Sequence, residues 1–222
     1  MTFDISSKGL TTLKGIDFPP DITILDCDNN QLTTLEGCPP SVTTLNCGVN
    51  QLTTLKGCPP NVTTLNCHFN QSTTLEGCPQ SVIYLGCSDN NLTTLERCPT
   101  KVKSLMCYNN LLTNLKGCPL SVIILNCSLN QLTSLKDVPP IVKEIYFYNN
   151  PLIDLYKYKD LKEIHKINRI KAFRKGISLL NRLILTVKIQ RYWRKWWYEE
   201  LDSENISRFI RKSFMDLNTL IS

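Results

Sequence analysis

Residues 38–57 read CPPSVTTLNCGVNQLTTLKG, and residues 58–77 read CPPNVTTLNCHFNQSTTLEG. The two stretches are nearly identical, and each carries cysteine at the same two places. An aliphatic residue recurs in one column every twenty residues: Leu25, Leu45, Leu65, Leu85, Leu105, Leu125 and Ile145. Asparagine recurs in another: Asn30, Asn50, Asn70, Asn90, Asn110, Asn130 and Asn150. Such self-similarity predicts a stack of repeats, each burying its apolar face against its neighbours.

Within one copy, TTLNC alternates between outward and inward positions, which predicts a short strand with Leu45 and Cys47 facing the core. Asn50 falls where the chain leaves the strand. Its amide is expected to bond to the backbone of neighbouring coils, which would otherwise be buried and unpaired. The Pro39-Pro40 pair favours extended backbone over helix on the return side of the coil.

The pattern L-x-x-L-x-L-x-x-N-x-L is spelled, with small substitutions, by Val42, Leu45, Cys47, Asn50, Leu52 and Leu55. It resembles the leucine-rich repeat. The twenty-residue copies are similar to those of type III-secreted bacterial effectors, with Cys-Pro in place of Leu-Pro, and to repeat proteins of large viruses of amoebae. The resemblance implies a solenoid over residues 1–156, with a concave sheet of parallel strands, an extended convex side with little helix, and a role in protein binding.

Four explanations are available for the cysteine columns: disulfides, metal ligation, catalysis or packing. Phe147 replaces cysteine in one column, and Phe18 and Val138 replace it in the other, so both columns tolerate large apolar side chains. Free cysteine behaves as a small buried hydrophobe at such positions. The paired C-x-x-C spacing of zinc sites is absent from the sequence. Packing is therefore the predicted role.

The residues flanking the inward leucines are predicted to form the concave surface. This surface gains aromatic and thioether side chains toward its C-terminal half, and the predicted partner-binding residues are Tyr84, Met106, Tyr108, Tyr146 and Tyr148. The alternative is that the C-terminal segment covers these side chains. His68 has no acidic partner at a suggestive spacing in the sequence, so it is expected to be a solvated strand histidine.

Residues 157–222 differ from the repeats in composition and charge. Residues 1–156 contain nine Lys or Arg against twelve Asp or Glu, a net charge of −3, whereas the remainder contains sixteen against seven, a net of +9. Apolar residues at helical spacing predict an α-helical C-terminal segment, beginning with a capping helix near Asp160.

Ile189-Gln190 followed by Arg194 resembles the IQ motif, with Lys195 and Glu199 at its later glycine and basic positions. The resemblance implies a calmodulin-like partner. The predicted contact residues of this tail are Ile189, Gln190, Trp193, Arg194 and Trp197. A basic, tryptophan-bearing helix also suits an anionic membrane surface or single-stranded nucleic acid, and its apolar residues could equally pack on neighbouring helices.

No phosphate-binding glycine loop, metal cluster or nucleophile–base pair occurs in the sequence. We therefore expect a non-enzymatic module without cofactor or small-molecule substrate, binding an unidentified protein. The chain shows neither a signal peptide nor an apolar run of about 20 residues that could span a membrane. The expected location is the cytoplasm, or the cytoplasm of a host cell if the protein is a viral or secreted effector.

Overall fold

The computed structural model describes residues 1–135, 137–139 and 141–152. The helices predicted for residues 157–222, with the IQ-like motif among them, lie outside the described residues.

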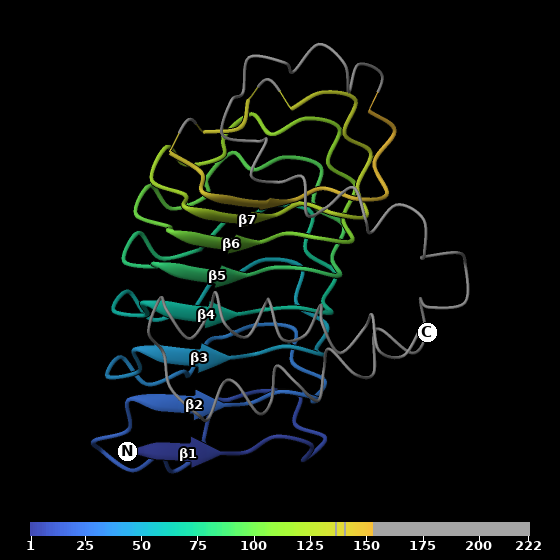
Figure 1. Ribbon diagram of the computed structural model, residues 1–222. Helices are drawn as coiled ribbons and strands as arrows, with labels where there is room; N and C mark the ends of the chain where they lie inside the picture. The colour runs from blue at the N-terminus through green and yellow to red at the C-terminus, as the bar shows by residue number, and fades with distance from the viewer. Residues whose placement is uncertain (136, 140, 153–222) are drawn as a thin grey trace, which may run out of the picture. The chain divides into compact units, whose positions relative to one another are not determined.

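Eight strands of three residues each form one parallel sheet in which every strand pairs with the next along the chain (Figure 1). They are β1 (Thr2–Asp4), β2 (Ile24–Asp26), β3 (Thr44–Asn46), β4 (Thr64–Asn66), β5 (Tyr84–Gly86), β6 (Ser104–Met106), β7 (Ile124–Asn126) and β8 (Glu144–Tyr146). From β2 to β8 the register is the sequence period itself, since Leu25 pairs with Leu45 and Leu45 with Leu65. No helix occurs in the described part of the chain, as the proline pairs predicted.

The first coil was not predicted. Strand β1 pairs with β2 at an offset of 22 residues, because Phe3 lies opposite Leu25. The longer offset moves this coil out of the twenty-residue columns, and it has no asparagine of its own at the turn. Instead, the backbone N–H groups of Lys8 and Leu10 donate to Oδ1 of Asn30, at 3.0 and 2.9 Å.

The core is a set of columns that run the length of the solenoid. The inward strand residues Leu45 and Cys47 are fully buried, as their alternation with polar neighbours predicted. The cysteine of the second column, exemplified by Cys78 and Cys98, packs in the same apolar cluster. All eleven cysteines are free thiols, nine buried and two, Cys38 and Cys58, half-buried. The packing role predicted for them is confirmed by this placement.

The cysteine of the strand column also makes a contact that sequence reasoning missed. Sγ of Cys27 lies 3.2 Å from the carbonyl oxygen of Asn46 on the next coil, and Sγ of Cys47 lies 3.4 Å from that of Asn66. A thiol is a weak donor, so each such contact adds to packing a small directional bond between coils. Valine would fill the same space without this bond.

The asparagine column holds the coils together, as its position at the turn predicted. Nδ2 of Asn50 donates to the carbonyl oxygens of Cys47 and Gly48 on its own coil and of Cys27 on the coil before. Its Oδ1 accepts the N–H of Leu32 at 2.8 Å. One buried amide thereby satisfies four backbone groups on two coils, and the arrangement recurs with small variations to Asn150.

The residue before each ladder asparagine adopts a left-handed conformation whatever its type. Asn29, Asn109 and Asn149 tolerate this region well, but Val49 and Phe69 occupy it too, with φ of 47° and 48°. A β-branched residue is strained there. The ladder therefore imposes the turn on the chain against the local preference of some residues.

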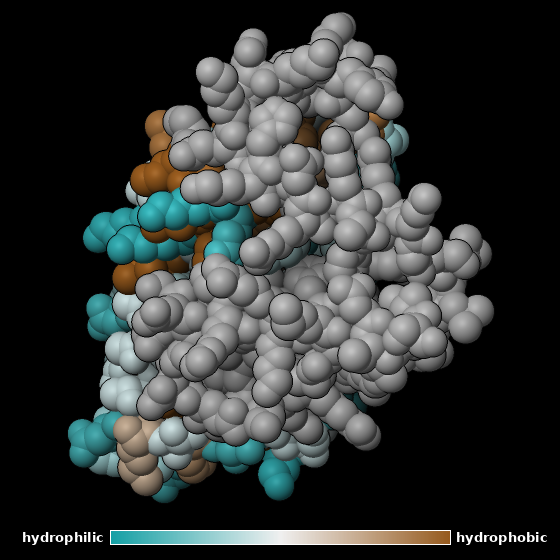
Figure 2. All heavy atoms as spheres, in the orientation of Figure 1, coloured by the Kyte–Doolittle hydropathy of each residue, from teal (hydrophilic) through white to brown (hydrophobic). Residues whose placement is uncertain are grey.

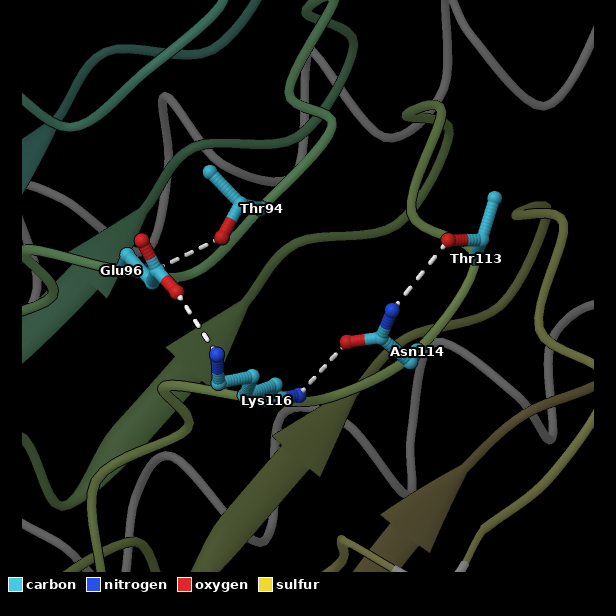
Figure 3. A network of polar contacts seen from close by, with 5 residues as sticks. All are labelled: Thr94, Glu96, Thr113, Asn114 and Lys116. Carbon is cyan, nitrogen blue, oxygen red and sulfur yellow. Dashed lines mark hydrogen bonds and ion pairs between the residues drawn. The ribbon is translucent and has the colours of Figure 1, made fainter.

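A tight turn on the return side brings consecutive coils into backbone contact. Gly57 has φ of +86°, and a Cβ at this position would lie 2.5 Å from the backbone nitrogen of Glu36 on the preceding coil. Figure 3 shows the same region at a later coil, where Nζ of Lys116 lies 3.3 Å from Oε1 of Glu96. Lys56 and Glu76 pair likewise. These exposed pairs add at most about 1 kcal/mol each.

Replacing Asn90 with alanine should lower the free energy of unfolding by about 3 kcal/mol or more. Its Nδ2 contacts the carbonyl oxygens of Cys67, Cys87 and Ser88, and each buried group left without a partner costs about 1–3 kcal/mol. Asn91→Ala is the matched control, because Asn91 is exposed. Chemical denaturation of the full chain gives both values. Equal stability of the two variants would show that the ladder does not stabilise the fold.

Alkylation by iodoacetamide should be slow for all eleven thiols in the native protein and complete in denaturant. Burial raises the pKa of Cys67 and Cys118 to about 12, so the reactive thiolate is scarce at neutral pH. Peptide mass spectrometry should find Cys38 and Cys58 labelled first. Fast labelling of one buried thiol, such as Cys87, would contradict the packing role and indicate an activated cysteine.

Candidate functional site on the outer sheet face

Each strand has one side chain in the core and its flanking side chains on the opposite face of the sheet. This opposite face, here called the outer sheet face, is the one predicted to be concave. Its rows are set by the register, so that Thr44, Thr64 and Tyr84 form one row and Asn46, Asn66 and Gly86 form another. The register thus places residues that are twenty apart in the sequence beside each other.

The five predicted contact residues lie on this face toward the C-terminal end of the sheet. Met106 of β6 and Tyr146 of β8 share a row, separated by Asn126, and Tyr84 belongs to β5. Tyr108 and Tyr148 lie two residues beyond the ends of β6 and β8. Tyr84, Tyr146 and Tyr148 are half-buried, whereas Met106 is 4% exposed and Tyr108 is 7% exposed. Whether these five residues contact a partner stays a prediction.

Apolar surface also gathers at the edge where the chain enters the later strands. Figure 2 shows hydrophobic residues, with hydrophilic ones among them, at the left edge beside the later strands, where the edge beside β1–β3 is mostly pale or hydrophilic with a few hydrophobic residues. Leu120 is 77% exposed in the segment that enters β7, and Ile141 is 48% exposed in the segment that enters β8. Large exposed aliphatic side chains thus lie beside the entrances to β7 and β8.

At the N-terminal end the outer sheet face is polar and internally bonded. Oδ1 of Asp26 accepts the backbone N–H of Asp28 at 2.9 Å and Nδ2 of Asn46 at 3.1 Å. Oδ1 of Asn46 accepts the N–H of Gly48 in turn. Each of these short side chains accepts a hydrogen bond from the backbone N–H of the second residue after it. This bond stabilises the turn at the end of the strand.

His68 is buried with 5% exposure, so the expected solvated histidine is wrong. Its Nδ1 lies 3.0 Å from Oδ1 of Asn66, and its ring packs edge-on against Phe69. A Cβ at Gly48 would lie 2.3 Å from Nδ1 of His68 and 2.8 Å from Oδ1 of Asp28. The side chains of Asp28 and His68 therefore converge over a glycine, although one whole coil lies between their own coils.

The sequence signal for the meeting of Asp28 and His68 is the column that contains Asp28, Gly48 and His68. Asp28, Gly48 and His68 are spaced at the repeat period, and a glycine between two larger polar residues in one column leaves room for them to meet. Burial lowers the pKa of His68 from 6.5 to about 4, so the imidazole is neutral at physiological pH. The neutral imidazole, bonded to the amide of Asn66, packs as a structural element of this face.

Neither a metal centre nor a membrane span was found in the part of the chain that the structure describes. No group of three His, Cys, Asp or Glu side chains is placed to hold a metal ion there. Within the same residues, no helix is long and apolar enough to cross a bilayer.

Gly48→Ala should destabilise the fold because the added methyl group collides with the imidazole of His68. The same substitution in a His68→Ala background should cost much less, since the colliding ring is gone. Urea denaturation of the four proteins gives the coupling energy, for which about 1–3 kcal/mol is expected. If the losses of unfolding free energy in the two single variants add up to that of the double variant, the His68 ring does not lie against Gly48.

Stability should fall as the pH drops from about 6.5 to about 4 because of His68. In this range the imidazole of the unfolded chain takes up a proton that the buried ring does not, so protonation favours unfolding. The loss is on the order of 3 kcal/mol, complete near pH 4. His68→Gln should remove it. Asp89 titrates in the same range with the opposite sign, so the two proteins compared must differ at residue 68 alone.

Comparison with known proteins identified neither a matching family model nor a similar curated protein. Solved structures do match. YopM from Yersinia enterocolitica WA-314 is 31% identical over 63% of this chain, with a TM-score of 0.57. A leucine-rich effector YopM from Yersinia pestis is 26% identical over 60% of this chain, with a TM-score of 0.51. The match spans only 31% and 40% of those two chains.

The leucine-rich-repeat domain of a Shigella effector matches more of its own length. It is 24% identical to this chain, covering 74% of this chain and 76% of the domain with a TM-score of 0.61. At that identity the likeness concerns the fold. Together with the eight in-register parallel strands and the asparagine and leucine columns, these matches identify residues 1–152 as a leucine-rich-repeat solenoid similar to those of bacterial effector proteins.

Proposed function

We propose that the chain is a non-enzymatic protein-interaction module that binds a protein partner through the C-terminal end of its outer sheet face. The observation that carries this proposal is the row pattern, in which Met106 and Tyr146 flank Asn126, and Tyr108 and Tyr148 flank Ser128. Tyrosine and methionine offer large contact area with modest polarity and are enriched at protein interfaces. At the N-terminal end of the same face, the polar side chains form hydrogen bonds with one another and with the adjacent backbone.

The free thiols suit a reducing compartment, and the resemblance to bacterial effectors suggests the cytoplasm of a host cell. The core thiols would be at risk of oxidation outside such a compartment. We therefore include a cytoplasmic location in the proposal, since stable disulfides are rare in the cytosol.

The test uses the full chain with a photo-activated cross-linking residue at position 146, and at position 131 as the control. Gln131 is exposed in the segment between β7 and β8. A partner identified at position 146 alone is then purified and its affinity measured. Tyr146→Ala and Tyr84→Ala should each weaken binding about tenfold or more, as expected for central aromatic contacts, while Gln131→Ala should not. Unchanged affinity in both tyrosine variants would exclude this face.

We propose further that residues 157–222 recruit a second, calmodulin-like partner through Ile189, Gln190 and Arg194. The excess of basic residues in this part favours one alternative, an adaptor that associates with a membrane surface or nucleic acid. All three tryptophans of the chain lie at residues 193, 196 and 197, so their fluorescence reports on this segment.

Titration of the full chain with calmodulin, with and without calcium, separates these possibilities. Saturable binding that Ile189→Glu abolishes supports recruitment of a calmodulin-like protein. Binding to phosphate-bearing polymers that weakens steeply with salt supports the alternative instead. Absence of both would remove the tail from the proposed function and leave the outer sheet face.

A further inference from the structure

The edge at which the chain enters the strands changes its chemistry along the solenoid. The residue directly before β2, β3 and β4 is threonine. Before β5 to β8, isoleucine and lysine alternate instead, as Ile83, Lys103, Ile123 and Lys143. The early coils form the same backbone with threonine, so the fold itself does not require this change.

Backbone hydrogen bonds place these four residues side by side on consecutive coils. The N–H of Lys103 donates to the carbonyl oxygen of Ile83 at 2.8 Å, that of Ile123 to Lys103 at 2.7 Å, and that of Lys143 to Ile123 at 2.8 Å. Neighbouring strands lie about 4.8 Å apart, so the side chains form one continuous row. The isoleucines in it are half-buried, and the lysines are exposed.

Three further side chains widen this row into a patch. Leu120 and Ile141 are 77% and 48% exposed, and they lie three residues before Ile123 and two before Lys143. Lys101 is exposed two residues before Lys103. Hydrophobic and hydrophilic residues lie among one another at this edge beside the later strands (Figure 2). The surface called here the entrance patch consists of Lys101, Lys103, Leu120, Ile123, Ile141 and Lys143.

The entrance patch is cationic. Within the residues that the structure describes, none of its three lysines pairs with a carboxylate, whereas Lys56 and Lys116 do. The acidic residue next to it in the sequence, Glu144, is half-buried on the outer sheet face, where its Oε2 lies 3.5 Å from the hydroxyl oxygen of Tyr146. The patch therefore combines exposed aliphatic side chains with positive charge.

This combination suits a membrane surface better than a protein. Lysine is depleted at protein interfaces, and leucine is under-represented among the residues that dominate their binding energy. At an anionic membrane, aliphatic side chains enter the boundary between headgroups and acyl chains. Lysines extend their ammonium groups to the phosphates while their alkyl stems cover apolar surface. The cytoplasmic leaflet of cell membranes carries such anionic lipids.

We propose that the entrance patch binds the surface of a membrane that contains anionic lipids. The positive charge of Lys101, Lys103 and Lys143 complements the lipid phosphates, and Leu120 and Ile141 enter the interface. This inference goes beyond the proposed function and uses none of the residues assigned to the protein partner. Each can therefore hold without the other. The contact is reversible and weakens as salt rises, because few apolar groups are inserted.

The test places an environment-sensitive fluorescent residue at position 120 of the full chain. Position 111 is the matched control, because Leu111 is 43% exposed but follows β6 at the opposite end of the strand. With vesicles that contain phosphatidylserine, the emission at position 120 should shift to the blue and be quenched by lipids with spin-labelled acyl chains. Position 111 should show neither effect, and vesicles of phosphatidylcholine alone should produce none.

Variants then measure the contribution of each kind of side chain. Replacing Lys101, Lys103 or Lys143 with glutamine should each weaken binding to the phosphatidylserine vesicles about fivefold. Leu120→Ser should weaken it about tenfold. Lys8→Gln, at an exposed position in the first coil, is the control and should bind as the original chain does. All these side chains are exposed, so urea denaturation should find the variants as stable as the original chain.

The local probe is needed because the basic residues 157–222 offer a second route to the same vesicles. If the chain sediments with vesicles while the probe at position 120 stays in water, that route alone explains binding and the inference is overturned. Equal responses at positions 111 and 120 also overturn it. If the patch variants leave vesicle binding unchanged but remove cross-links from position 120 to a protein, the entrance patch is a protein interface instead.

Discussion

The asparagine ladder is the interaction on which the rest of the solenoid depends. Each amide joins the strand exit of its own coil to that of the coil before, and Asn50 alone satisfies four backbone groups there. Because the ladder sets the backbone, the turn residue beside it need not prefer a left-handed conformation, and Val49 and Leu129 occupy it nonetheless. The side chains that the outer sheet face displays can therefore vary without altering the scaffold.

Most of this scaffold could be predicted from the sequence because it is repeated. A column that accepts Cys, Phe and Val in one molecule reveals itself as core, and an unbroken column of asparagine indicates a shared bonding role. Features that occur once could not be predicted in this way. The 22-residue first coil falls outside the period, and the depth at which Met106 and Tyr108 are buried depends on packing that no column encodes.

The candidate site shows the same division. The tyrosine positions follow from alternation along the strands, but the polar partners among them do not. Asp28 and His68 lie two repeat periods apart in the sequence, so only the stacked coils bring them together over Gly48. When the copies are aligned on the twenty-residue period, Asp28, Gly48 and His68 fall next to one another in a single column.

The strict twenty-residue register has a consequence for how such a chain can change over generations. The strand pairings and the asparagine hydrogen bonds of an interior coil join it to the coil before or after it, and they are of the same kind at each step. Unequal crossing-over between near-identical gene segments would therefore add or remove a whole coil and join matching surfaces at the seam. The length of the outer sheet face can thus evolve by recombination, in steps that leave the fold intact.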